Sequence, residues 1–232
     1  ASSKRCRSRS SIRANMAAAA REAGRDPKEI LLVGASKMND AAACREAVAA
    51  GIDALGENRV QEMVQKLEQH AYDGAPLHFI GHLQRNKVKQ VVGHVALIQS
   101  VGSLELLDEI EKVAAARGLV QDILLEVNIG REAAKSGFAP EKVLPAAEAA
   151  LERTHVRVRG LMTIPPADAQ RDANFRYFQE VQALYVDMNQ KLFHNELEYL
   201  SMGMSGDYED AIRAGATMVR VGSAIFGARH YN

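Results

Sequence analysis

Short apolar runs alternate with helical patterns along the chain from residue 30 onward. The runs are rich in Val, Ile and Leu and nearly continuous in hydrophobicity, as is typical of strands covered on both faces. Regular alternation of such strands with helices predicts βα units and a parallel sheet. The pattern predicts eight strands, at 30–36, 53–56, 77–81, 95–100, 122–129, 156–164, 197–202 and 218–222.

Residues that start and stop helices occupy the segments between these runs. Ser103 can cap a helix that Gly118 ends, and the apolar positions between them repeat with helical spacing. Asp40 can likewise cap a helix at 41–50. A further helix is predicted at 14–28, before the first strand.

Eight βα units in about 200 residues fit a closed (β/α)8 barrel, whose usual size range begins near that length. An open doubly wound sheet is the alternative. Such a sheet would usually carry a glycine-rich turn after its first strand, and Ser36-Lys37-Met38 is not one. No linker or change in composition interrupts the series. We therefore predict a single α/β domain over 14–232, a TIM barrel with an extra N-terminal helix.

The first thirteen residues differ from the rest in composition. Five basic residues stand there among serines, with no acidic residue before Glu22. The composition resembles that of a transit peptide, but a disordered tail is the favoured prediction for 1–13.

Composition and charge narrow the class of protein. Lys and Arg together number 29, and so do Asp and Glu, so a formal net charge of zero gives no reason to expect nucleic acid or a membrane as a partner. No apolar run is long enough to cross a bilayer. Cys6 and Cys44 provide neither a disulfide framework nor metal-ligand spacing, and His78 and His82 lack a third ligand. These features predict a cytoplasmic, monomeric protein without a bound metal.

Lys37 follows directly on the first predicted strand. Because side chains alternate along a strand, Lys37 shares a face with Leu31, Val33 and Ala35. If that face points into the barrel, the amine lies at the carboxyl mouth, where barrel active sites are found. A lysine removed from water favours the uncharged amine that forms Schiff bases with a carbonyl substrate or an aldehyde cofactor. A surface lysine in a loop is the alternative, and position alone does not decide between them.

Two turns rich in glycine and serine follow the seventh and eighth predicted strands. Ser205-Gly206 precedes a short helix, and Gly222-Ser223 precedes another. Small residues let the backbone approach a ligand, and a helix N-terminus presents free N–H groups to an anion. Loops at these two places commonly bind phosphate in (β/α)8 barrels, so we predict a phosphate site, with ordinary loop residues as the alternative.

Arg220 lies inside the apolar eighth strand. A guanidinium stays protonated in proteins and needs a partner when it is buried. It either belongs to a buried ion pair, for which Asp207, Glu209 and Glu57 are candidates, or faces a ligand at the barrel mouth.

Seven ordered motifs from about residue 14 to the C-terminus resemble those of the pyridoxal phosphate homeostasis proteins, whose fold is similar to the barrel domain of alanine racemase. The motifs are ASK (35–37), GENRVQE (56–62), HFIGHLQRNK (78–87), KSGF (135–138), RGLMTIP (159–165), LSMGMS (200–205) and MVRVGSAIFG (218–227).

The resemblance implies pyridoxal 5′-phosphate (PLP) as the cofactor and assigns residues to it. Lys37 would form the internal aldimine, and Arg220 would face the pyridine nitrogen. The remaining roles fall to residues at the strand ends. Ser205, Gly222 and Ser223 would hold the phosphate, Ser201 and Met202 would line the site, Asn58 would lie near the cofactor, and Ile164 would pack under the ring.

The same resemblance implies a protein of intracellular vitamin B6 homeostasis that buffers PLP or delivers it to apo-enzymes. Other B6 vitamers are possible ligands, and the exposed basic residues Arg85, Lys87 and Lys89 are either a solvated face or a second site for a phosphorylated vitamer. An arginine opposite the pyridine nitrogen disfavours protonation of that nitrogen and leaves the ring a weak electron sink. The chain also stops at Asn232, so we expect no second domain to supply a further acid or base.

Two enzymatic readings stand as alternatives. The chain is either a single-domain PLP-dependent amino-acid racemase or lyase, with water or Tyr208 as the missing acid, or a Schiff-base aldolase without a cofactor. The aldolase requires Lys37 but neither the phosphate turns nor Arg220, and is the weakest of the three readings.

Overall fold

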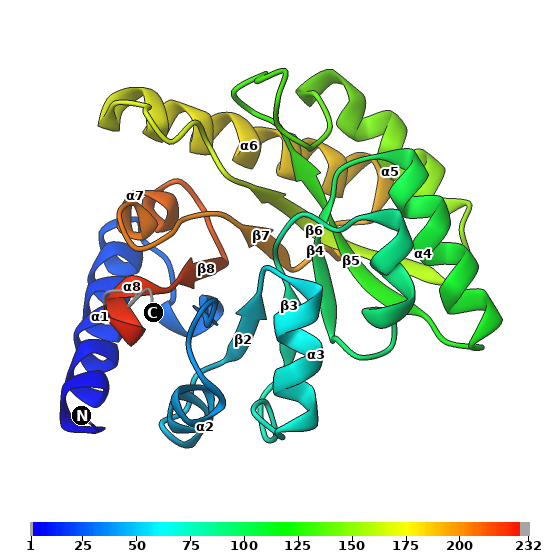
Figure 1. The fold of residues 1–232 in the computed structure, drawn as a ribbon. Coiled ribbons are helices and arrows are strands. Elements are labelled where there is room, and N and C mark those ends of the chain that lie inside the picture. The colour runs from blue at the N-terminus through cyan, green and yellow to red at the C-terminus, as the bar shows by residue number, and fades with distance from the viewer. Residues whose placement is uncertain (1, 228–232) are drawn as a thin grey trace.

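Eight parallel strands close into a barrel in the structure, a computed structural model that describes residues 2–227, with side chains from Arg9 onward (Figure 1). Each strand pairs with the next along the chain, and the last closes on the first through Leu31↔Met218 to Gly34↔Val221. The strands are β1 (Leu31–Ala35), β2 (Ala54–Glu57), β3 (Leu77–Phe79), β4 (Leu97–Val101), β5 (Gln121–Val127), β6 (Val156–Thr163), β7 (Tyr199–Ser201) and β8 (Met218–Val221). All eight predicted strands are present, and the predicted TIM barrel is confirmed.

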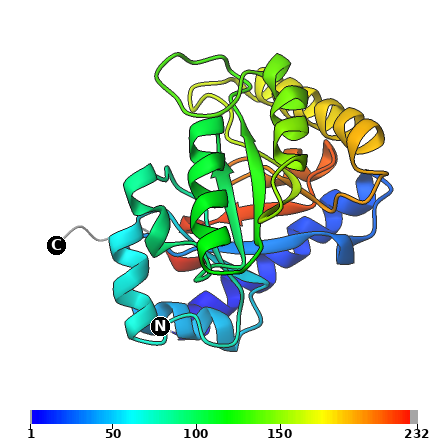
Figure 2. The ribbon, with the colours of Figure 1, turned by 90° about the vertical axis from the view of Figure 1, so that its right-hand side faces the viewer.

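Helices surround the barrel on its outer side (Figures 1 and 2). They are α1 (Ser2–Glu22), α2 (Ala41–Ala49), α3 (Val60–Glu68), α4 (Leu104–Ala116), α5 (Val143–Leu151), α6 (Arg171–Leu192), α7 (Tyr208–Arg213) and α8 (Ser223–Phe226), with 3-10 turns η1 (Pro27–Glu29), η2 (Arg85–Gln90) and η3 (Pro140–Lys142). Both predicted caps form: the side chain of Asp40 accepts the N–H of Ala43, and that of Ser103 accepts the N–H of Leu106.

The barrel encloses a small hydrophobic cluster of its own, separate from the larger one between the strands and the helices. The enclosed cluster consists of Val33, Ala54, Leu97, Leu124, Met162 and Met218, with Leu31 and Tyr199 packed against it. Leu31 and Val33 therefore face the barrel interior, which decides a direction that the sequence left open. Because side chains alternate, the same register carries Lys37, two residues beyond β1, toward the carboxyl mouth.

Helix α1 begins earlier than predicted. It runs from Ser2 rather than from residue 14, so the expected disordered tail at 1–13 is helical from residue 2 in the structure. Arg9 donates to the backbone oxygen of Ala47 at 3.0 Å, and Ile12 is buried against the barrel wall. These contacts come from residues distant in sequence, and local composition carries no sign of them.

Helix α1 covers the part of the barrel next to β8 that the short helix α8 does not cover. Helix α8 is only four residues long, and α1 packs against both α7 and α8 (Figure 1). Asn15 donates to the phenol oxygen of Tyr208 at 3.1 Å, and Arg25 donates to the backbone oxygen of Ile212 at 2.8 Å. The extra helix therefore completes the outer ring beside β8 and β1.

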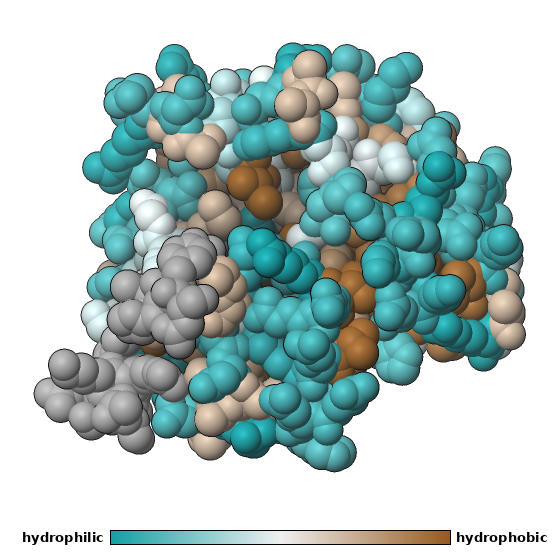
Figure 3. Space-filling model, in the orientation of Figure 1, coloured by the Kyte–Doolittle hydropathy of each residue, from teal (hydrophilic) through white to brown (hydrophobic). Residues whose placement is uncertain are grey.

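Hydrophilic residues cover most of the molecular face seen in Figure 3, and hydrophobic side chains show through only in small groups. Within residues 2–227, no helix is both long and apolar enough to cross a membrane.

The packing of α1 predicts a measurable loss of stability. Ile12→Ala removes a side chain that is 4% exposed, so the free energy of unfolding should fall by about 2–5 kcal/mol in chemical denaturation. Ser11→Ala, at an exposed position of the same helix, should change it by less than about 0.5 kcal/mol. Equal effects of the two substitutions would show that α1 is not packed as described.

Candidate functional site

The carboxyl ends of parallel strands lie at one face of a closed barrel, and the residues predicted to form the site follow those ends. Lys37 comes after β1, Asn58 after β2 and Ile164 after β6, while Ser205 and Ser223 belong to the turns after β7 and β8. The structure therefore brings the predicted residues to one mouth, apart from Met202.

The backbone on both sides of Lys37 is held from outside the barrel. The Lys66 ammonium donates to the backbone oxygen of Ser36 at 2.9 Å, and the Met38 N–H donates to the Glu62 carboxylate at 2.6 Å. Lys66 and Glu62 are themselves an ion pair at 2.9 Å. Met38 has a φ of 62°, a left-handed conformation that costs free energy for a residue other than glycine. This clamp fixes the direction in which Lys37 leaves the strand.

A fully buried carboxylate anchors the clamp. Glu57 Oε1 accepts from the Ser36 hydroxyl at 2.5 Å, from Lys66 at 2.7 Å and from the Tyr72 hydroxyl at 2.8 Å, while its Oε2 has no hydrogen-bond partner. Burial raises the pKa of Glu57, and the neighbouring charge of Lys66 opposes the rise. Glu57 thus pairs with Lys66, and this candidate ion-pair partner of Arg220 is engaged elsewhere.

The turns after β7 and β8 meet through one hydroxyl. Ser205 Oγ accepts from the N–H groups of Gly222 at 3.3 Å and Ala224 at 3.5 Å, which are long hydrogen bonds. A Cβ on Gly222 would lie 3.1 Å from the backbone oxygen of Ala35, so this glycine lets the β8 turn approach the end of β1. The predicted phosphate residues therefore surround a small region with inward-pointing N–H donors.

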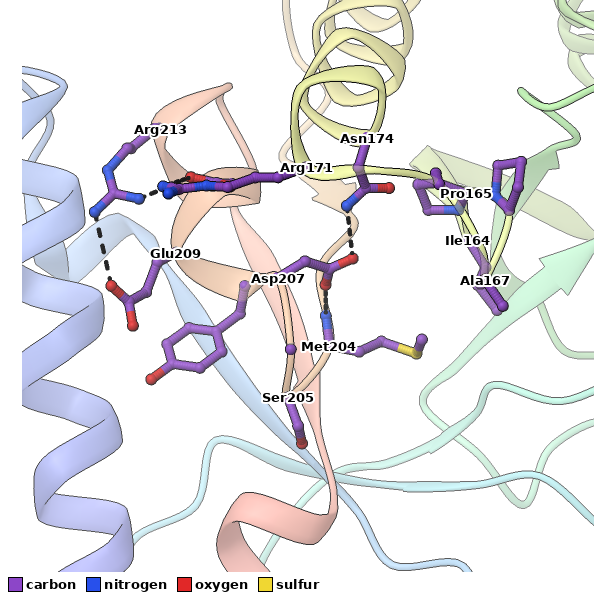
Figure 4. Close-up of a pocket in the computed structure, with 15 residues that line it drawn as sticks. Ile164, Pro165, Ala167, Arg171, Asn174, Met204, Ser205, Asp207, Glu209 and Arg213 are labelled. Carbon is purple, nitrogen blue, oxygen red and sulfur yellow. Dashed lines mark hydrogen bonds and ion pairs between the residues drawn. The ribbon is translucent and has the colours of Figure 1, made fainter.

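The β7–α7 turn is rigidly built. Asp207 accepts the Met204 N–H at 2.7 Å and the Asn174 side-chain amide at 3.0 Å, and Figure 4 shows its carboxylate directed at both. Gly203 has a φ of 102°, and a Cβ there would lie 2.7 Å from the Cβ of Ala211. Only glycine fits this position, and the turn that presents Ser205 is therefore fixed at both ends.

Arg220 is buried without an ion pair among the described residues. Its side chain is 3% exposed, and it donates to the Ser201 hydroxyl at 2.5 Å and to the Thr163 backbone oxygen at 3.1 Å. Burial lowers the pKa of Arg220 to about 10, and Glu126 and Asp207 oppose that shift from a distance. The group remains a cation at neutral pH, in the unusual position of a buried charge that lacks a bonded counter-ion.

The ion-pair partners considered for Arg220 bind elsewhere. Glu209 lies 3.6 Å from Arg213 and Glu57 2.7 Å from Lys66, while Asp207 is used by the β7–α7 turn. None of the three carboxylates considered as ion-pair partners therefore forms an ion pair with Arg220 among the described residues.

Ser201 and Met202 separate onto opposite faces of the chain. The Ser201 hydroxyl lies inside the barrel, bonded to Arg220, whereas Met202 is fully buried in the cluster between strands and helices. The Met202 side chain therefore points away from the barrel interior, and the place of this residue in the cofactor site stays a prediction. The side chain points this way because side chains alternate at the end of β7, so adjacent residues cannot both face inward.

Three polar side chains of the barrel interior were not predicted as site residues. His78, Gln99 and Glu126 are buried near Arg220, on β3, β4 and β5. Glu126 accepts from the Ser136 hydroxyl at 3.3 Å. Burial raises the pKa of Glu126, while the Ser136 hydrogen bond and the charge of Arg220 oppose the rise. In the sequence, each of these residues is a polar position inside a largely apolar predicted strand, and this pattern could have identified them.

A cavity of about 610 Å³ opens beside the phosphate turn (Figure 4). Its walls come from the β6–α6 loop and the β7–α7 segment, and they include Ile164 and Ser205 but neither Lys37 nor Arg220. Arg171 and Arg213 in its wall are both paired with Asp210. The wall also holds three carboxylates, Asp207, Glu209 and Asp210, against these two guanidinium groups, so the cavity is not a second anion site.

The predicted basic patch lies in η2, where Arg85, Lys87 and Lys89 are exposed. Across the described part of the chain, no group of three or more His, Cys, Asp or Glu side chains could hold a metal ion.

The sequence and the structure of the chain both resemble known proteins. The family model for the alanine racemase N-terminal domain matches residues 8–230. A pyridoxal phosphate homeostasis protein of Aquifex aeolicus is 43% identical over 92% of this chain and 93% of its own length, and one of Pseudomonas aeruginosa is 41% identical over 95% and 94%. The solved structure of PipY from Synechococcus elongatus with PLP bound has a TM-score of 0.83 and 31% identity, covering 96% of this chain and all of that one. The chain therefore belongs to the alanine racemase N-terminal domain family and, within it, to the pyridoxal phosphate homeostasis proteins.

Proposed function

We propose that this protein binds PLP at the barrel mouth, attached to Lys37, and buffers it or delivers it to apo-enzymes rather than catalysing a reaction with it. The observation that carries the proposal is the buried cation of Arg220, which has no ion pair among the described residues and lies in the same mouth as the clamped lysine and the phosphate turns. The relatives named as homeostasis proteins and the PLP-bound PipY structure support it.

The residues present fit the chemical groups of PLP. Arg220 donates one N–H of Nη1 to Ser201 and one N–H of Nη2 to Thr163. Its remaining N–H groups are further donors for an acceptor such as an unprotonated pyridine nitrogen. The N–H groups of Gly222 and Ala224, now on Ser205, suit a phosphate oxygen. Lys37 would add its amine to the aldehyde carbon, and one water molecule leaves as the Schiff base forms. Asn58 and Ile164 would border the ring.

Arg220 also argues for storage over catalysis. A guanidinium that donates to the pyridine nitrogen disfavours its protonation, and an unprotonated ring withdraws electrons weakly from a bound amino acid. The cofactor is held, but its most useful chemical property is suppressed. Exchange of the Schiff base with another amine needs no such electron sink.

The racemase or lyase alternative loses one of its two candidate acids and is left with water. Tyr208, proposed from sequence, is a buried residue whose hydroxyl accepts a hydrogen bond from Asn15 of α1. It is thus engaged on the outer side of the barrel. A cofactor-free aldolase would leave the phosphate turns and Arg220 without a role.

Cofactor transfer tests the proposal directly. Protein loaded with PLP, mixed with an apo-form of a PLP-dependent enzyme, should restore that enzyme's activity. The same protein reduced with borohydride should restore none, because reduction makes the lysine bond permanent. Loaded protein incubated with a panel of amino acids should convert at most one equivalent, as judged by chromatography. Many turnovers on any amino acid would favour the racemase or lyase instead.

The phosphate assignment predicts a difference between two B6 vitamers. Ser205→Ala should weaken PLP binding by about ten- to a hundredfold, since a hydrogen bond to a charged group contributes roughly 1.5–3 kcal/mol. Binding of pyridoxal, which lacks the phosphate, should not change. Absorbance titrations of both vitamers give the two affinities, with Ser11→Ala on the exposed face of α1 as the control. Equal losses for both vitamers would contradict a phosphate role for Ser205.

A further inference from the structure

Four buried polar side chains form one continuous chain of hydrogen bonds across the barrel interior. Arg220 of β8 donates to Ser201 Oγ of β7 at 2.5 Å, and Ser201 donates to Gln99 Oε1 of β4 at 2.6 Å. The Gln99 amide nitrogen lies 2.9 Å from His78 Nδ1 of β3 and 3.1 Å from Met218 Sδ. None of the four polar residues is more than 6% exposed.

The direction of every hydrogen bond in this chain follows from its ends. Arg220 can only donate, so the Ser201 oxygen accepts from it, and the Ser201 hydroxyl donates its own proton to Gln99 Oε1. Gln99 must therefore present its oxygen to Ser201 and its NH2 group to the far side. The thioether of Met218 can only accept, which agrees with that orientation. His78 Nδ1 must then accept, so the ring carries its single proton on Nε2.

The environment of His78 supports this state independently. The ring is buried, and desolvation lowers the pKa of His78 to about 4. The imidazole is uncharged at neutral pH, as an accepting Nδ1 requires.

We propose that this relay of hydrogen bonds orients Arg220 toward the ring of the bound cofactor, and that Gln99 and His78 are positioning residues for it. The inference rests on the proposed function, because it assigns the ring end of the PLP site. It adds two residues that do not border the mouth and act only through Arg220.

A competing negative charge explains why such a relay is needed. Glu126 is the carboxylate with the strongest opposing effect on the pKa of Arg220, and it is itself buried at the next inward position of β5 after Leu124. A guanidinium with free rotation would turn toward that charge. The bonds to Ser201 and to the Thr163 oxygen hold it in place, and Gln99 and His78 fix Ser201 as an acceptor. The cation is therefore kept available for a ligand.

Gln99→Leu tests the relay, because leucine is similar in size but can neither donate nor accept. We expect binding of PLP and of pyridoxal to weaken by a similar factor, about tenfold, since the ring end is common to both. The absorbance maximum of the bound cofactor should also shift, because the hydrogen bond to the ring nitrogen changes. Ser100→Ala is the matched control: this neighbouring hydroxyl is buried and has no partner, so its loss should leave both affinities and the spectrum unchanged.

A second readout needs no cofactor. Nitrogen NMR of the cofactor-free protein should show His78 protonated at Nε2 only, and Gln99→Leu should move the Nδ1 signal while Ser100→Ala does not. Should Gln99→Leu fail to fold in a melting experiment, Ser201→Ala cuts the same chain one link earlier and is expected to give the same changes.

The outcomes separate the two proposals. If the unsubstituted protein binds PLP, but the relay variants match Ser100→Ala in affinity and spectrum, the relay is refuted and the proposed function stands. A proton on His78 Nδ1 also refutes the relay. If the unsubstituted protein binds no PLP, the proposed function fails together with the assigned role of the relay, whatever the NMR shows.

Discussion

The site is organised around one buried positive charge. Removing a guanidinium from water costs several kcal/mol even after the protein relaxes, and a carboxylate in contact is the usual compensation. Arg220 has none among the described residues and is held instead by a hydroxyl and a backbone oxygen. The burial of Arg220 lowers the stability of the fold, but it leaves a cation that no carboxylate of the described residues neutralises before a ligand binds. In the proposed arrangement, Ser201, Gln99 and His78 hold the guanidinium in that state, away from the buried Glu126 carboxylate.

The barrel turns this local feature into a site because it brings distant segments to a single mouth. In the proposed site, one end of the ligand is held by the β7 and β8 turns, which are joined through the Ser205 hydroxyl, and the other end by Lys37. Lys37 is supported from outside, where the ion pair of Lys66 and Glu62 fixes the backbone on either side of it. The two supports are independent, so the distance between the reactive amine and the phosphate turn is set by the rigid strands β1 and β8, which pair directly.

Sequence reasoning succeeded where the signal was local. Strand periodicity, the caps at Asp40 and Ser103, the shared face of Leu31 and Val33, and the turns at Ser205 and Gly222 all follow from short segments. It failed where the cause lay far along the chain. The first thirteen residues were expected to be disordered, because local composition does not reveal that Arg9 donates to Ala47 in α2. Which side chain faces inward, that of Ser201 or that of Met202, could not be predicted because the pattern does not fix the end of β7. Gln99 joins residues of three other strands, and only the closed barrel shows that they meet.

The central claim is that Lys37 is the residue that carries the cofactor. Protein incubated with PLP can be reduced with borohydride, digested, and mapped by mass spectrometry for the added pyridoxyl phosphate group. The account predicts one modified site, Lys37, at close to one group per chain, with the buried Lys66 and the exposed Lys135 unmodified. Modification at another lysine, or none on a correctly folded protein, would contradict it.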